Sequence, residues 1–166
     1  SYTVAANFAG LAGTWRSTVS ASGAVADGVF QEVLVDSQLA ATVDLFGMNA
    51  GETGPVYAMV EVSGPVAVEF ATVKADIFNA TTGATVRSGL VLKDDGVAPD
   101  EKANDGKYSI NLTDLARGEY EIVVTVTNGG QAVFSTSGNT KQGTNKPAVP
   151  VPNFQRVTSE TFVKDR

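Results

Sequence analysis

The chain has 166 residues, of which 43% are hydrophobic and 18% charged, and its formal net charge is -6. This apolar content is enough for a folded core, whereas the acidic balance disfavours nucleic acid and anionic membranes, which need a basic face. The absence of histidine and cysteine removes the commonest general base, the Ser-His-Asp triad, disulfides and nearly all zinc and copper sites. No apolar run approaches the roughly 18 to 20 residues of a membrane helix, so we expect no membrane insertion.

Alternation of apolar and polar residues with a period of two runs along most of the chain and predicts β-strands rather than helices. In the N-terminal third, strands are predicted at 14–20, 30–36 and 41–46. Gly54 and Pro55 then mark a seam in the chain. We therefore assign residues 1–54 to an N-terminal strand layer that packs on, or precedes, the main sandwich.

The central region, 55–146, has the strongest strand pattern. Four strands are predicted at 56–62, 72–77, 85–92 and 107–112, with a turn at 81–83. The clearest strand is 119–127, whose predicted buried face carries Tyr120, Ile122, Val124 and Val126. Asn128-Gly129-Gly130 follows as a strong turn signal and predicts a hairpin with residues 131–135.

The last segment, 147–166, combines a proline-rich connector at 147–152 with a predicted strand at 154–163. The whole chain thus predicts about eight or nine short strands, which is typical of a sandwich or barrel. Tyr120 follows Gly118 and Glu119 at a strand entry, as in the tyrosine corner of Greek-key sandwiches. The predicted fold class is all-β, an immunoglobulin-like or fibronectin-like Greek-key β-sandwich.

The candidate chemical site is the acidic loop, residues 94–106, which holds five of the 18 acidic residues. Crowded carboxylates repel one another, and calcium, which takes six to eight oxygen ligands in flexible geometry, would neutralise them. The alternative is a solvated turn in which Asp and Asn side chains cap backbone N–H groups. If the loop binds calcium, the predicted ligands are Asp94, Asp95, Asp100, Asn104 and Asp105.

Other candidate sites are weaker. Tyr2, Trp15 and Tyr57 are aromatic residues that would serve a carbohydrate-binding module, although Trp15 fits a core position on a strand better. Asn79 and Asn111 begin N-x-[ST] sequons, which act only if the source glycosylates exported proteins. Nothing in the sequence brings two catalytic acids together, so we expect no enzyme activity and no catalytic residues.

The acidic loop and its flanks resemble a domain of the calcium-activated chloride channel regulator family, with further similarity at Gly13-Thr14-Trp15, Gly118-Glu119-Tyr120 and 154–163. The family pattern L-x-D-[DN]-G-x-x-x-D-x-x-x-[ND]-D-G-x-Y-S is matched by Leu92, Asp94, Asp95, Gly96, Asp100, Asn104, Asp105, Gly106, Tyr108 and Ser109. The resemblance implies an accessory, extracellular β-sandwich. The family's H-E-x-x-H protease motif and D-x-S-x-S adhesion motif are absent, so neither activity is carried over.

These observations predict a non-catalytic structural or interaction module of a secreted or cell-surface protein, which calcium would stabilise if the acidic loop binds metal rather than forming a capped turn. Its expected partners are protein neighbours in a larger chain or assembly. One alternative is a self-assembling filament or surface-layer subunit, a homo-oligomer in which the C-terminal strand adds to a neighbour's sheet. The other alternative is a carbohydrate-binding module.

Overall fold

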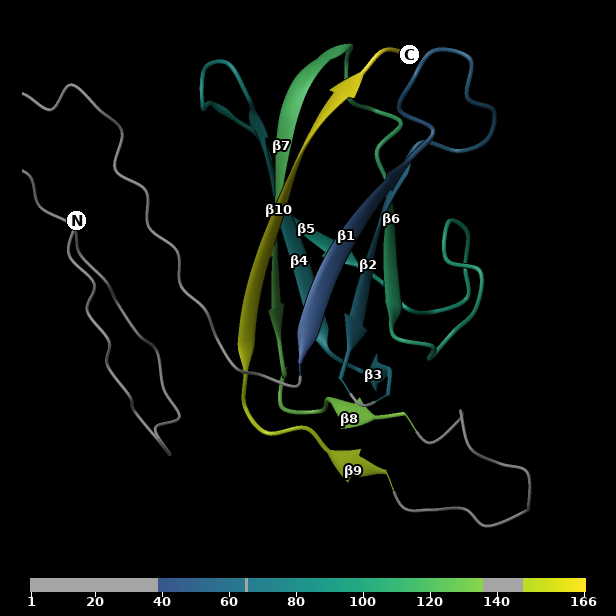
Figure 1. Ribbon diagram of the computed structural model, residues 1–166, viewed down its shortest axis with the longest axis vertical. Helices are drawn as coiled ribbons and strands as arrows, with labels where there is room; N and C mark the ends of the chain where they lie inside the picture. Colours follow the sequence, from purple (N-terminus) through teal and green to yellow (C-terminus); the bar gives the residue numbers. More distant parts are fainter. Residues whose placement is uncertain (1–38, 65, 136–147) are drawn as a thin grey trace, which may run out of the picture. The chain divides into compact units, whose positions relative to one another are not determined.

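The computed structural model describes residues 39–64, 66–135 and 148–166, all within the compact unit Asp36–Arg166 (Figure 1). These residues form strands and contain no helix, which confirms the all-β prediction, and none of them forms a helix able to cross a membrane. The predicted strands at 14–20 and 30–36 lie outside the described residues. The strands are β1 (Ala40–Phe46), β2 (Tyr57–Ser63), β3 (Val68–Glu69), β4 (Thr72–Asn79), β5 (Thr85–Leu92), β6 (Lys107–Asn111), β7 (Gly118–Thr127), β8 (Val133–Phe134), β9 (Val149–Pro150) and β10 (Gln155–Lys164).

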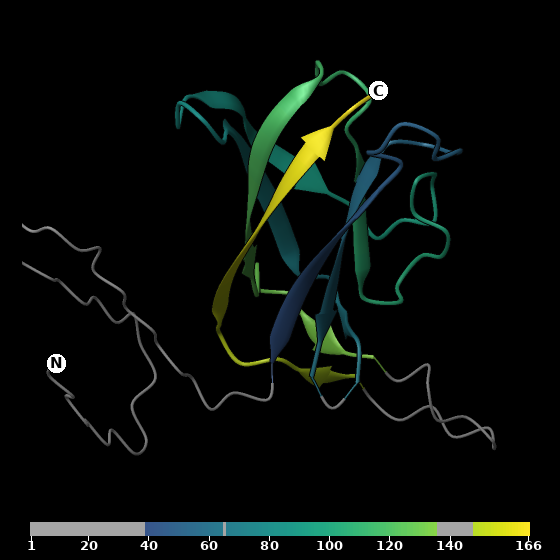
Figure 2. The same cartoon turned by 45° about the horizontal axis from the view of Figure 1, so that its top comes forward.

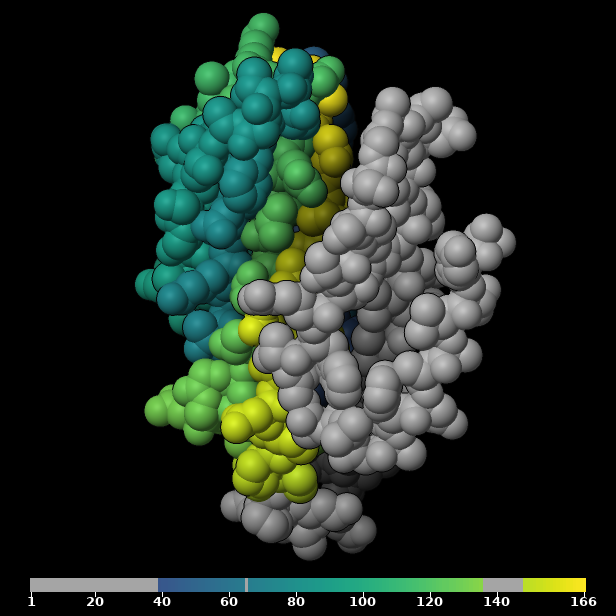
Figure 3. All heavy atoms as spheres, turned by 90° about the vertical axis from the view of Figure 1, so that its left-hand side faces the viewer, coloured from purple at the N-terminus to yellow at the C-terminus, as the bar shows by residue number. Residues whose placement is uncertain are grey.

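Two antiparallel sheets carry most of the structure and form a sandwich-like arrangement (Figures 1 and 2). One sheet has the order β1-β2-β6 and the other has the order β10-β7-β4-β5. A third, short sheet, β3-β8-β9, lies at one end of the sandwich. Figure 3 shows teal, green and yellow strands of the four-stranded sheet side by side.

The core lies between the two larger sheets and follows from the period-two pattern. Val60 of β2 is fully buried, as are Ile77 of β4 and Ile122 of β7. The predicted inner face of β7 is confirmed, since Tyr120, Ile122, Val124 and Val126 are all buried. Alternating apolar residues therefore specify which face of each strand meets the opposite sheet.

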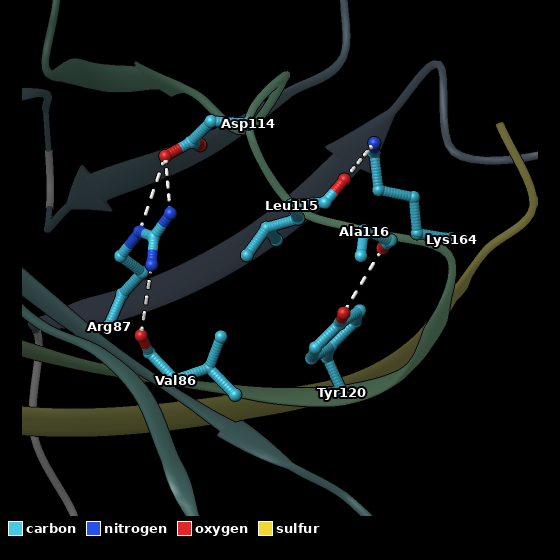
Figure 4. Close-up of polar contacts among 7 residues, drawn as sticks. All are labelled: Val86, Arg87, Asp114, Leu115, Ala116, Tyr120 and Lys164. Atoms are coloured by element: carbon cyan, nitrogen blue, oxygen red, sulfur yellow. Dashed lines mark hydrogen bonds and ion pairs between the residues drawn. The ribbon is translucent and has the colours of Figure 1, made fainter.

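The predicted tyrosine corner is confirmed at the start of β7 (Figure 4). The Tyr120 hydroxyl donates a hydrogen bond of 3.1 Å to the carbonyl oxygen of Ala116. Beside it, the Lys164 ammonium donates to the carbonyl oxygen of Leu115, and Arg87 and Asp114 form an ion pair of 2.9 Å. These contacts connect the segment before β7 with β5 and β10.

The predicted hairpin after β7 is wrong, although the turn itself is present. The N–H of Ala132 donates to the carbonyl oxygen of Asn128 at 3.1 Å, so the chain reverses where the Asn-Gly-Gly signal lies. However, β7 already pairs with β4 on one side and β10 on the other. With both edges occupied, the returning segment leaves the sheet and β8 pairs with β3 and β9 instead.

The predicted seam at Gly54 and Pro55 separates two strands of one sheet, because β1 and β2 pair in register from Ala40–Ser63 to Phe46–Tyr57. Residues 1–38 lie outside the described residues, so the 1–54 and 55–146 boundaries stay predictions. The predicted C-terminal strand is present as β10, which pairs with β7 of the same chain from Gln155 to Lys164.

Candidate metal site in the acidic loop

The acidic loop joins the end of β5 to the start of β6, and its two ends are tied together. Lys93 and Ser109 exchange backbone hydrogen bonds of 3.1 Å and 2.8 Å. This bridge links an outer strand of the four-stranded sheet to an outer strand of the three-stranded sheet. Backbone hydrogen bonds therefore fix the two ends of the loop next to each other.

Three of the five predicted ligands converge in the structure. Asp94, Asp100 and Asp105 each place one carboxylate oxygen within 4.8 Å of the others. Asp100 is 6% exposed, and the other two residues are half-buried. This three-carboxylate cluster is a set of hard oxygen donors of the type that calcium prefers.

The same carboxylates also cap backbone N–H groups of the loop. Asp94 accepts from the N–H groups of Asp105 and Gly106, at 3.2 Å and 2.9 Å. Asp100 accepts from Gly96 and Lys102 at 2.6 Å and 3.3 Å. A carboxylate has about four lone-pair sites, so these bonds leave acceptor capacity for a cation. The capped-turn arrangement is thus present and is compatible with a metal ligand set.

Two glycines let the loop close this tightly. Gly96 has φ +69°, and a Cβ there would lie 3.0 Å from the backbone nitrogen of Ala103. Gly106 has φ +84°, and a Cβ there would lie 2.9 Å from the Cβ of Ala67 and 3.0 Å from the carbonyl oxygen of Val62. Only glycine fits both the backbone conformation and the space.

The other two predicted ligands are placed differently. Asp95 is outside the three-carboxylate cluster; its carboxylate lies 3.8 Å from the Lys93 ammonium and accepts from the N–H of Val97 at 3.0 Å. Asn104 is exposed and has φ +58°, a left-handed conformation that asparagine tolerates. Within the described residues its side chain makes no hydrogen bond.

Burial makes the negative charge of Asp94 costly. Desolvation raises the pKa of its carboxyl above the ordinary value, the nearby charge of Asp105 raises it further, and the N–H donors of Gly106 and Asp105 partly oppose the shift. A cation bound beside this carboxylate would favour its ionised form. Burial and the charge of Asp105 therefore both disfavour the ionised form of Asp94.

Sequence reasoning missed the role of Tyr108, the second residue of β6. Its side chain is 3% exposed, and burial raises the pKa of its hydroxyl above the ordinary 10.0. The hydroxyl donates to the carbonyl oxygen of Val68 at 2.9 Å and accepts from the N–H of Ala71 at 2.9 Å. The period-two pattern signals that this side chain points inward, but no local signal identifies partners 37 to 40 residues away.

The aromatic site predicted for a sugar is only partly described. Tyr57 is half-buried and stacks on Phe46 across the β1–β2 pair, with ring centroids 4.7 Å apart and an interplanar angle of 13°. The pair borders an open hollow of 340 Å³ that Glu52 and Thr53 also line. Tyr2 and Trp15 lie outside the described residues. The stacked pair is sufficiently explained as a cross-strand contact that stabilises the end of the sheet.

Comparison with known proteins identifies no relative of this chain. No protein family, no curated protein and no solved structure matches this chain.

Proposed function

We propose that this chain is a non-catalytic structural or interaction module of a secreted or cell-surface protein, and that calcium stiffens its acidic loop. The observation that carries the proposal is the convergence of Asp94, Asp100 and Asp105 within 4.8 Å. The bound ion would neutralise the carboxylates and hold the loop closed between β5 and β6. The module would then act by presenting or spacing its protein neighbours, with no chemical step.

The ligand chemistry favours calcium over magnesium. Calcium accepts six to eight oxygen ligands in flexible geometry, so carboxylates, backbone carbonyls and waters together complete its shell. Magnesium requires near-ideal octahedral geometry and retains most of its waters, which suits a site with fewer protein ligands. The chain has no histidine or cysteine, which disfavours zinc and copper.

We further propose that the sandwich is immunoglobulin-like. If only the strands of the two larger sheets are compared with an immunoglobulin domain, β1, β2 and β6 take the places of A, B and E, and β10, β7, β4 and β5 take those of G, F, C and C′. The tyrosine corner at Tyr120 is a feature of the same sandwiches. Such domains are frequent on cell surfaces, which agrees with the resemblance to the calcium-activated chloride channel regulator family and with an extracellular location.

The two alternatives have less support. The filament alternative needs the C-terminal strand to leave its own domain, whereas β10 pairs with β7 of the same chain along its full length. The carbohydrate alternative has only the stacked pair of Phe46 and Tyr57 within the described residues. Neither arrangement points to a partner as directly as the three-carboxylate cluster points to a cation.

The test is a calcium titration by calorimetry, combined with thermal melting, on the wild type, Asp105→Asn and Asp95→Asn. The two variants are matched, because each aspartate accepts a 3.0 Å hydrogen bond from the N–H two residues later, and only Asp105 belongs to the three-carboxylate cluster. Calcium at about one hundred times its dissociation constant should stabilise the wild type by about 2.7 kcal/mol. Asp95→Asn should respond similarly and Asp105→Asn should not. A wild type that binds no calcium, or two variants with equal responses, would overturn the site.

A further inference from the structure

The strands β1 and β10 belong to different sheets but lie side by side (Figures 1 and 2). At one end, the Arg156 guanidinium at the start of β10 donates a 3.1 Å hydrogen bond to the carbonyl oxygen of Leu39, directly before β1. At the other end, Arg166, two residues after β10, donates at 2.7 Å to the carbonyl oxygen of Gly47, directly after β1. The two strands therefore run in the same direction, with their starts together at one end of the sandwich.

This arrangement places the start of β1 and the end of β10 at opposite ends of the sandwich. Residues 1–38 precede β1, so a pull on the chain from that side enters the sheet at Ala40. A pull from the C-terminal side enters the other sheet at Lys164. Tension between the two sides would therefore draw β1 and β10 past each other, parallel to their own lengths.

Both strands are held against such sliding by a long ladder in their own sheet. β1 pairs with β2 along all seven residues Ala40–Phe46, and β10 pairs with β7 along all ten residues Gln155–Lys164. The hydrogen bonds of an antiparallel ladder lie perpendicular to the strands. Sliding a strand along its length therefore strains all of these bonds at once, whereas pulling it sideways breaks them one after another.

Arg166 adds a clamp between the end of β10 and the loop that joins β1 to β2. Its guanidinium donates to three carbonyl oxygens of this loop, those of Gly47, Glu52 and Gly54. Next to it, the backbone N–H of Asp165 donates to the carbonyl oxygen of Met48 at 2.9 Å. These bonds join the two sheets where tension would enter β10, and they oppose movement of β10 relative to β1.

We propose that this module bears tension along its own chain, with the β1–β2 and β10–β7 ladders loaded in shear and the Arg166 clamp opposing their movement. The inference rests on the proposed role as a module among protein neighbours, and it does not require calcium. Forced unfolding depends on the barrier to unfolding rather than on equilibrium stability. The direction of the pull, at unchanged stability, therefore decides the force at which the fold gives way.

The test is single-molecule force spectroscopy of the full chain in calcium-free chelator buffer. The chain has no cysteine, so two introduced cysteines define the points of pulling. Ala40→Cys with Asp165→Cys pulls along the strands, whereas Ala40→Cys with Ser63→Cys separates two residues that face each other across the β1–β2 ladder. The first pair should rupture at a force at least about threefold higher, because its ladder bonds must break together. Equal forces, or a weaker first pair, would overturn the proposal.

Arg166→Ala and Arg87→Ala are matched variants for the clamp. Each guanidinium makes three hydrogen bonds, but those of Arg87 go to Asp114 and Val86 and join neither β1 nor β10. In the lengthwise geometry, Arg166→Ala should lower the rupture force by about a third and Arg87→Ala should leave it unchanged. In the sideways geometry neither variant should have an effect. Equal effects of the two variants, or a loss in both geometries, would contradict the role of the clamp.

The outcomes separate the two proposals. If the wild type binds no calcium, the proposed metal site fails, and the rupture forces in chelator buffer still differ between the two directions. If the rupture forces are equal in the two directions, the tension-bearing inference is wrong, and the calcium titration is unaffected.

Discussion

The side-chain amide of Asn128 donates a hydrogen bond to the carbonyl oxygen of Val151, which lies 23 residues later. The same amide nitrogen also donates to the carbonyl oxygen of Pro152 at 3.3 Å. Asn128 is only 7% exposed, and its backbone N–H donates to the carbonyl oxygen of Phe154. One residue directly after β7 thus fixes the connector through which the chain enters β10.

Asn128→Asp should destabilise the fold, because it replaces a buried double donor by a carboxylate that faces two carbonyl oxygens. We expect the free energy of unfolding to fall by about 2–4 kcal/mol at neutral pH, measured by urea denaturation. Asn111→Asp is the control, because Asn111 is exposed at the end of β6. Equal losses in the two variants would contradict the role assigned to the Asn128 amide.

Tyr120→Phe tests the tyrosine corner (Figure 4). The substitution leaves the buried ring and removes the 3.1 Å hydrogen bond to Ala116, so we expect a loss of about 1–2 kcal/mol in the free energy of unfolding. Tyr57→Phe is the matched control, because the Tyr57 hydroxyl makes no hydrogen bond among the described residues. The midpoints of urea denaturation should therefore differ between the two variants, and a common midpoint would exclude a stabilising role for the corner.

The inner faces of the strands could be predicted because local alternation encodes burial, as Ile122 and Val124 on β7 show. Strand pairing could not be predicted in the same way. Nothing near Asn128 indicates that β4 and β10 occupy both edges of β7, which leaves no edge for the predicted hairpin. Whether the edge of a strand is already paired depends on residues far away in the sequence. A turn signal depends only on a few consecutive residues.

The candidate site, like the fold, could be predicted from the sequence only in part. The density of acidic residues pointed to the loop, and Asp94, Asp100 and Asp105 do converge. Composition alone could not separate them from Asp95, which lies outside the cluster and caps the N–H of Val97. The difference lies in which side chains a tightly turned backbone directs inward, and this loop turns tightly with Gly96 and Gly106 both at positive φ.

Tyr108 should make stability depend on alkaline pH. Its pKa is raised above the ordinary 10.0 in the folded protein, so its stabilising contribution is fully present below pH 10. As the pH rises further, the unfolded chain loses this proton and the folded chain keeps it. The free energy of unfolding should then fall with a slope of up to about 1.4 kcal/mol per pH unit from this group.

The measurement is urea denaturation of the wild type and Tyr108→Phe between pH 8 and about pH 11. All other titrating groups are shared, so the difference in unfolding free energy between the two proteins isolates Tyr108. The wild type should lose its advantage above the unfolded pKa. A pH-independent difference would mean that the hydroxyl titrates alike in the two states.

Gly106→Ala should cost more stability than Gly51→Ala, although both glycines have positive φ. The values are +84° and +93°, so the backbone penalty is similar, about 1–2 kcal/mol. A Cβ at Gly51 meets nothing within 4 Å, whereas a Cβ at Gly106 would lie 2.9 Å from the Cβ of Ala67 and 3.0 Å from the carbonyl oxygen of Val62. Crowding against the backbone should add about 1–3 kcal/mol at Gly106 alone.

Chemical denaturation of both glycine variants measures this difference, and calcium titration shows whether it concerns the acidic loop. Asp94 accepts a hydrogen bond from the N–H of Gly106, so displacing Gly106 should also move this carboxylate and weaken calcium binding. Gly51→Ala should leave the calcium dissociation constant unchanged. Equal stability losses would mean that the loop moves aside to admit the methyl group. In that case the close packing of Gly106 against Ala67 would not constrain the acidic loop and would not connect this loop to β3.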